Sequence, residues 1–239
     1  GAFATPDEFQ RSKGYTICEI QGIKVAFVAF TKGMDSLGLP DGSDRCVNVL
    51  YTDYATTYKN VDENKITSIL RALEAEGPDI TIAMVHWGSE YNDDISKSQK
   101  SIVSLMQKQG VDVILGTHPH TLQPIVFDEA AGTLVAYSLG DFYGDGVKGG
   151  TNYSILLDIE ITMDNTNRDT RVTNYSITPI YTLKENECDS QRRVVRIQEA
   201  MFAYESNYVD RITGAAYSSM QTALKRIEER IKPPVEEED

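Results

Sequence analysis

The sequence predicts an α/β protein in which helices alternate with buried strands and a later antiparallel ribbon adds a second layer. Two continuous apolar runs, 79–86 and 111–116, have the composition of strands that are buried on both faces. Each run follows a segment whose apolar residues recur at helical spacing, 62–76 and 95–109. The segment 152–180 contains two stretches of alternating apolar and polar residues, as paired antiparallel strands do. This order is typical of a layered α/β fold, with the two apolar runs as adjacent central strands and both helices on one sheet.

The N-terminal part predicts a hairpin and then a long loop. Residues 15–20 and 23–30 are apolar and β-branched, and a glycine-containing turn separates them. Cys18 lies in the first of these runs, so we expect a small buried side chain there. From 31 to 60 the chain is rich in polar and turn-forming residues without a clear period. We therefore expect a loop, which is a candidate for a functional lid.

After the second buried run, the predicted order is a hairpin, the antiparallel ribbon and two C-terminal helices. Residues 122–127 and 133–138 flank a turn and form the hairpin. Beyond Cys188 the apolar residues return to helical spacing, and Pro233 ends the second helix. The expected inward-facing residues are Val194, Ile197, Met201, Tyr204 and Tyr208 in the first helix, and Ile212, Ala216, Met220, Ala223, Ile227 and Ile231 in the second.

The expected division of the chain is a main domain over 1–185 and a C-terminal helical segment over 186–239. The apolar stripes of these helices need a surface to cover, and packing on the main domain is favoured over an arm that joins subunits. Residues 236–239 are all acidic and predict a disordered tail.

Composition argues against several classes of function. The net charge of −13 disfavours binding to nucleic acid and adsorption to anionic lipid, because both need basic patches. It does not exclude a phosphate substrate, since an acidic surface can hold a local cationic or metal-bearing pocket. The chain has no run of about 18 apolar residues, so no transmembrane segment is expected, and its N-terminus lacks the pattern of a signal peptide.

The three histidines of the chain all follow predicted buried strands. His86 ends the first apolar run, and His118 and His120 follow the second. Strand ends are where open α/β sheets place their sites, so three imidazoles should meet at one edge. Packing would explain a single histidine, but this grouping favours a metal site, and imidazole suits Zn, Fe and related metals. Extended backbone is favoured before Pro119, so the two histidines that flank it should point the same way.

Three further residues are candidates near this edge. Glu90 could hydrogen-bond a ligating imidazole or lie beside the metal, and a solvated loop glutamate is an equal alternative. Trp87 could wall the pocket or serve only in packing. Asp141 follows another predicted strand and could touch the site.

Three motifs in order resemble the CapA family of bacterial capsule-synthesis proteins. HWGSEY begins at His86, GTHPH at Gly116 and YSLGDF at Tyr137, and the family patterns are HWG-x-E, G-x-HPH and YSLGNF. The resemblance covers roughly residues 1–182 and corresponds to the C-terminal half of a family member. It implies a metallophosphoesterase-like β-sandwich flanked by helices and incomplete at its N-terminus. The early family motifs, a Gly-Asp, an Asn-Leu-Glu and an Asn-His with a later Asp, would precede residue 1.

The resemblance also implies a function. The family is linked to synthesis or export of capsular polymer, including poly-γ-glutamate, which implies an extracytoplasmic location in the cell envelope. The expected partners are components of the capsule machine or the polymer itself. Whether the chain forms a homo-oligomer is left open by the resemblance. The implied activity is that of a metal-dependent phosphoesterase-like hydrolase. The alternatives are a non-catalytic binding or assembly subunit of that machine, and a hydrolase that trims an amide-linked polymer.

The metal site implied by the resemblance holds two divalent ions, Mn, Fe or Zn, in the complete protein. His86, His118 and His120 would be the catalytic and metal-binding residues, the first two on one ion and the third on the other. Asp141 departs from the family's asparagine, and the early motifs would supply the bridging carboxylate. With three imidazoles divided between two ions, we expect this chain alone to bind metal weakly and not to hydrolyse phosphoesters, unless Glu90 or Asp141 substitutes.

Overall fold

The computed structural model describes residues 13–34, 37–39, 46–144, 146–188, 191–208 and 212–234. The predicted acidic tail at 236–239 lies outside these residues. The strands are β1 Tyr15–Ile20, β2 Ile23–Thr31, β3 Ile80–His86, β4 Val113–Thr117, β5 Ile125–Asp128, β6 Thr133–Ala136, β7 Tyr153–Met163, β8 Thr170–Leu183 and β9 Arg193–Arg196. The helices are α2 Glu63–Glu74, α3 Lys97–Lys108, α4 Ile197–Glu205 and α5 Gly214–Arg230.

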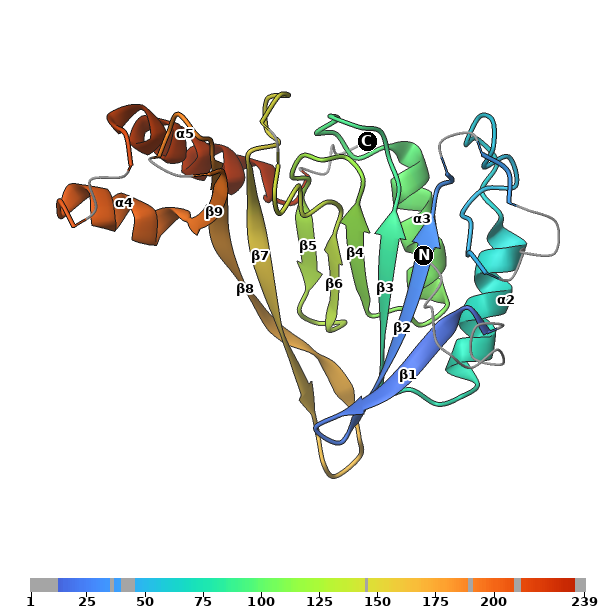
Figure 1. Ribbon diagram of the computed structural model, residues 1–239. Coiled ribbons are helices and arrows are strands. Elements are labelled where there is room, and N and C mark those ends of the chain that lie inside the picture. The colour runs from blue at the N-terminus through green and yellow to red at the C-terminus, as the bar shows by residue number, and fades with distance from the viewer. Residues whose placement is uncertain are drawn as a thin grey trace.

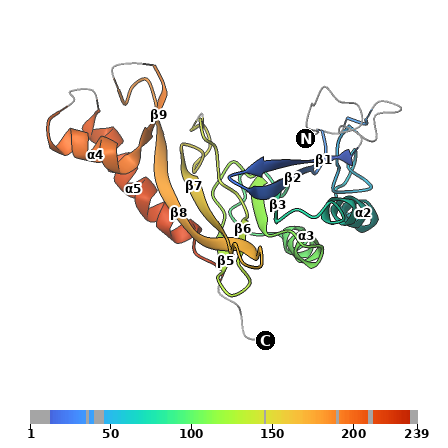
Figure 2. The ribbon, with the colours of Figure 1, turned by 90° about the horizontal axis from the view of Figure 1, so that it is seen from below.

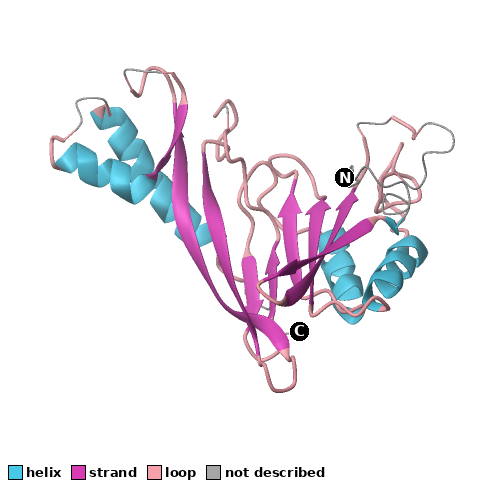
Figure 3. Cartoon of the chain, turned by 60° about the horizontal axis from the view of Figure 1, so that its bottom comes forward, coloured by secondary structure: helices cyan, strands magenta, loops and turns pink. Residues whose placement is uncertain are grey.

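Two β-sheets lie between two pairs of helices, as Figures 1 and 2 show. The larger sheet has the strand order β1-β2-β3-β4-β6-β5, and the smaller has the order β7-β8-β9. α2 and α3 lie beside the larger sheet, and α4 and α5 lie beside the smaller one (Figure 3). β3 and β4 are adjacent and parallel in the larger sheet. The predicted layered α/β fold is therefore confirmed, together with both predicted hairpins and the antiparallel ribbon.

The outer face of the larger sheet packs on α2 and α3. Both helices begin at a side chain that accepts a backbone N–H: Asp62 caps α2, and Ser96 forms a capping box with Gln99 at the start of α3. Their apolar residues recur at three- and four-residue spacing, so each helix presents one buried stripe. The buried residues of these stripes are Ile66, Leu70, Leu73, Ile102, Val103 and Met106.

A second core fills the space between the two sheets and continues under the C-terminal helices. Val25 and Ile80 of the larger sheet, Ile155 of the smaller sheet and Met220 of α5 all belong to this single cluster of buried side chains. The backbone after α5 also joins the larger sheet, where Ile125 N donates to Ile231 O at 2.9 Å. No helix in the described part of the chain is long and apolar enough to cross a membrane.

The sequence predictions for Val194, Tyr208 and Cys18 are wrong, and Ile212 lies before α5 in a bridge to Cys188 rather than in that helix. Val194 lies in β9 rather than in a helix, because a β-branched residue beside the edge of β8 pairs with Thr182 and extends the smaller sheet. Tyr208 lies beyond the end of α4 and is 85% exposed. Cys18 is exposed rather than buried, because β1 is the edge strand of the larger sheet and turns its later residues to solvent.

The C-terminal part of the predicted loop after β2 is anchored by two β-bridges. Val49 bridges to Thr31, and Tyr51 bridges to Val61. Leu50 between them is fully buried. Residues 35–36 and 40–45 of this loop lie outside the described residues. The lid hypothesis stays a prediction.

Asp112 makes stability depend on pH. Its Oδ2 accepts the Thr81 N–H at 2.8 Å just before β4, and burial raises the pKa of this carboxyl from 3.8 to about 6. The folded chain therefore binds this proton more tightly than the unfolded chain, and the free energy of unfolding falls as pH rises from about 4 to about 6. Asp112→Asn removes the buried charge and keeps an oxygen that accepts from Thr81. We expect this variant to be more stable at pH 7 by about 1–2 kcal/mol.

Chemical denaturation of both proteins across pH 4–8 measures this effect. Glu129→Gln, on the exposed turn between β5 and β6, is the matched control and should change stability by less than about 0.5 kcal/mol. A stability difference between the wild type and Asp112→Asn that stays constant across this range would contradict the assignment.

Candidate functional site

Three parallel strands of the larger sheet end at the same level. Thr31 of β2 pairs with His86 of β3, and His86 pairs with Thr117 of β4. The alignment continues one residue farther, since Lys32 N donates to His86 O at 2.7 Å. The segments that leave these three strands therefore start side by side, and their side chains form the candidate site.

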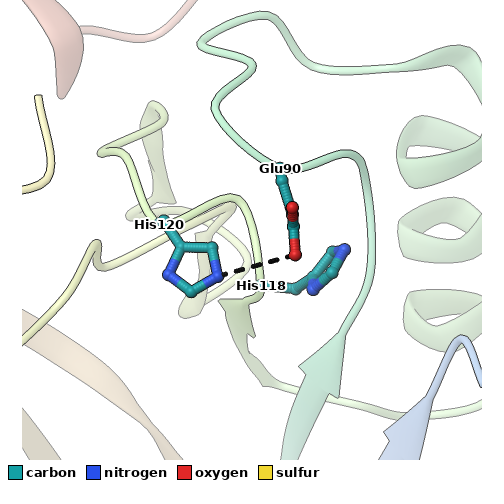
Figure 4. Close-up of side chains that lie close together, drawn as sticks. All are labelled: Glu90, His118 and His120. Carbon is teal, nitrogen blue, oxygen red and sulfur yellow. Dashed lines mark ion pairs between the residues drawn. The ribbon is translucent and has the colours of Figure 1, made fainter. Parts of the chain in front are cut away.

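Glu90, His118 and His120 bring three metal-ligating atoms together, and we call them the donor triad. One ligand atom from each of these residues lies within 4.8 Å of the other two. Figure 4 shows the Glu90 carboxylate between the two imidazole rings. Its Oε1 lies 4.0 Å from His120 Nε2. The ring centroid of His86 lies 4.4 Å from that of His118, but His86 is not a member of the triad.

The chemistry of the donor triad fits one divalent ion. Two imidazoles and one carboxylate are ligands of Zn, Fe and Mn, and three protein ligands leave coordination positions open for a substrate. The carboxylate is Glu90, whose side chain is 54% exposed, so the triad is open to solvent. This grouping differs from the division implied by the family resemblance, which placed His86 and His118 on one ion. The donor triad also includes a carboxylate ligand, Glu90, whereas the ligand set implied by the resemblance has only histidines from this chain.

The backbone around Pro119 is not extended, contrary to the sequence prediction. His118 and His120 have φ values of +96° and +60°, so each adopts a conformation that L-residues seldom take. Such residues cost on the order of 1–3 kcal/mol each and persist where the surroundings hold them. Here Tyr91, itself at φ +58°, donates its N–H to Pro119 O at 2.8 Å. The tight turn brings the two rings to 6.2 Å between centroids.

Two neighbours orient His120. Its Nδ1 lies 2.8 Å from Asp141 Oδ1, and the ring of Tyr91 stacks on its ring at 5.4 Å between centroids. A ligating histidine usually donates its second ring N–H to a carboxylate, which fixes the tautomer and leaves the other nitrogen for the metal. Asp141 has the position for that role, and Nε2 of His120 is the atom nearer Glu90.

Trp87 lies beneath the site and does not line it. The side chain is fully buried, its Nε1 donates to Tyr137 O at 2.8 Å, and its ring stacks on that of Tyr137 at 5.9 Å. Gly116 makes room for this contact, because a Cβ there would lie 2.0 Å from Tyr137 O and 2.6 Å from Trp87 Nε1. Burial also raises the pKa of Tyr137. These motif residues therefore support the turns that carry the histidines.

A pocket of about 470 Å³ opens beside the donor triad, and we call it the Lys32 pocket. Sequence reasoning missed Lys32, Ser89 and Tyr58. Lys32 could have been found, because it follows an apolar strand directly and so reaches the same sheet edge as His86. Tyr58 comes from the far end of the long loop and had no such signal. The lining residues are Lys32, Gly33, Tyr58, His86, Ser89, Glu90 and His118.

These features define an α/β protein with a candidate metal site at the ends of its parallel strands. The chain matches the family model of the bacterial capsule synthesis protein PGA_cap over residues 1–146 and belongs to that family. The family resemblance is thereby confirmed.

Two curated relatives share part of the chain. The PGA biosynthesis protein CapA of Bacillus subtilis (strain 168) is 35% identical over 102 residues, which are 43% of this chain and 25% of that protein. The capsule biosynthesis protein CapA of Bacillus anthracis is 39% identical over 67 residues, which are 28% of this chain and 16% of that protein. The match thus spans a quarter or less of each relative.

One solved structure, a novel phosphatase of Mycoplasma pneumoniae, aligns with 14% identity and a TM-score of 0.42. The alignment covers 70% of this chain and 57% of that one. A likeness at this level implies nothing about activity.

Proposed function

We propose that this chain acts in bacterial capsule synthesis as a metal-dependent hydrolase of a phosphoester or related bond. Family membership supports the role in capsule synthesis, and the donor triad beside the Lys32 pocket supports the chemistry. The names of the two relatives support a poly-γ-glutamate-like polymer as the product of the pathway and the cell envelope as the location.

The proposed roles follow from the geometry of the side chains. Glu90, His118 and His120 would hold one Mn, Fe or Zn ion. When bound, such an ion would act as a Lewis acid that polarises a phosphoryl oxygen. Asp141 would keep a proton on Nδ1 of His120 and so direct Nε2 toward the ion. His86 lines the adjoining pocket, where its imidazole can donate a proton to the leaving oxygen of a bound ester.

The alternative is a non-catalytic binding or assembly subunit, and one observation favours it. Many enzymes that transfer phosphoryl groups use two ions about 3.5–4 Å apart. Among the described residues, one group of metal-ligating side chains is present, and it fits a single ion. A protein that binds an anionic component without cleaving it needs no more than that.

Hydrolysis of a chromogenic phosphodiester in the presence of Mn²⁺ separates the two functions. We expect turnover by the wild type that a chelator abolishes and that a variant with all three histidines replaced by alanine lacks. Circular dichroism of both proteins controls for folding. Wild-type turnover no greater than that of the triple variant would overturn the hydrolase and leave the binding role.

A further inference from the structure

We infer that Lys32 is the residue that binds the anionic group of the substrate, a phosphate or phosphoester, in the Lys32 pocket. This inference rests on the proposed metal-dependent function and adds a substrate-binding residue to it. Three observations carry it: the fixed position of Lys32, the set of donors that share its pocket, and the distance between its ammonium and the donor triad.

The position of Lys32 is set by the sheet and by three contacts of its side chain. Its backbone N–H continues the pairing of β2 with β3. Its ammonium donates to Gly88 O at 2.9 Å, lies 3.1 Å from Nε2 of His118, and lies over the ring of Tyr58 at 4.7 Å from the centroid. An ammonium that donates to a carbonyl and lies over an aromatic face is held in one orientation. These contacts place the ammonium at one point in the wall of the pocket, where its positive charge can attract an anion.

The pocket gathers further groups that can donate hydrogen bonds to such an anion. The Ser89 hydroxyl and the His86 imidazole line it together with Lys32. Glu90 and His118 line it as well, and both belong to the donor triad. An anion in the pocket would thus lie next to an ion held by the triad, which is the arrangement that a metal-bound phosphoester requires. The chain as a whole carries a net charge of −13, so a local cation is needed to attract an anionic substrate to this point.

Lys32 should affect the metal and the anion in opposite directions. Its ammonium lies 3.1 Å from Nε2 of His118, so it repels a divalent ion that shares this imidazole. Removing its charge should therefore leave metal binding unchanged or strengthen it. Removing the same charge should weaken binding of the anion. A residue with only a structural role would weaken both, because its loss would disturb the whole site.

Isothermal titration of Mn²⁺ and then of inorganic phosphate into the wild type and Lys32→Gln tests this inference. We expect phosphate to bind the Mn²⁺-loaded variant about tenfold or more weakly, the effect of losing one charge-assisted hydrogen bond. We expect Mn²⁺ to bind it equally well or about two- to tenfold more tightly. Lys32→Arg should retain most of the phosphate affinity, and Lys100→Gln on the exposed face of α3 should match the wild type.

The outcomes separate this inference from the proposed function. Equal phosphate affinity of Lys32→Gln and the wild type would overturn the role of Lys32 and leave the metal site intact. Weaker binding of both Mn²⁺ and phosphate by Lys32→Gln would also overturn it, in favour of a structural role. Lys32-dependent phosphate binding without turnover of any phosphodiester would support the inference and reject the hydrolase. No phosphate binding by the wild type would overturn the inference itself.

Discussion

Replacing Trp87 with alanine is expected to reduce the free energy of unfolding by about 3–5 kcal/mol, the range for a large aromatic side chain removed from a packed core. Trp87 is fully buried in the cluster between the larger sheet and the helices α2 and α3. Its loss leaves a cavity and deprives Tyr137 O of the indole N–H.

Urea denaturation followed by far-UV circular dichroism measures this change. Phe202→Ala is the matched control, because Phe202 is 70% exposed on α4 and should cost less than about 0.5 kcal/mol. Trp87→Phe fills most of the space and should lose about 1–3 kcal/mol, mainly from the unmet carbonyl. A loss in Trp87→Ala no larger than that of the control would contradict the packing of Trp87 in this core.

Much of the fold could be predicted because burial on two faces leaves a strong signal in sequence. The strands β3 and β4 are continuous apolar runs between amphipathic helices, and few other arrangements bury such runs. The secondary structure of the C-terminal part leaves a weaker signal in the sequence. Val194 fits the spacing of the following helix as well as the strand that it forms, because four residues are too few to show a period of two.

The site could be predicted in part. All three histidines follow buried strands and could be predicted as site residues for that reason, and Lys32 follows β2 in the same way. The turn at Pro119 could not be predicted, because local preference favours extended backbone there and contacts from Tyr91 override it. The place of Glu90 beside His118 depends on that turn, so sequence alone left its role open.

Removing any member of the donor triad is expected to weaken binding of Zn²⁺ and Mn²⁺ about 100-fold or more. Three ligands that converge on one ion leave none to spare, and loss of an outer partner of a ligand already costs about 10–100-fold. Calorimetric titration of the wild type should show one ion per chain. Glu90→Gln, His118→Ala and His120→Ala should each weaken that binding about 100-fold or more. Asp141→Asn should weaken it less, by about tenfold, because Asp141 orients His120 and is not itself a ligand.

His86→Ala is the control that decides how the imidazoles are shared. It removes a histidine whose ring lies 4.4 Å from that of His118 but which contributes no atom to the donor triad, so metal affinity should change by less than about tenfold. If His86→Ala instead abolished binding while Glu90→Gln left it unchanged, the metal would lie between His86 and His118, as the family resemblance implies. If the wild type bound two ions per chain tightly, a single-ion site would be wrong. If the wild type bound metal no more tightly than His118→Ala, the sequence prediction of weak metal binding would hold. The donor triad would then be a cluster of side chains and not a metal site.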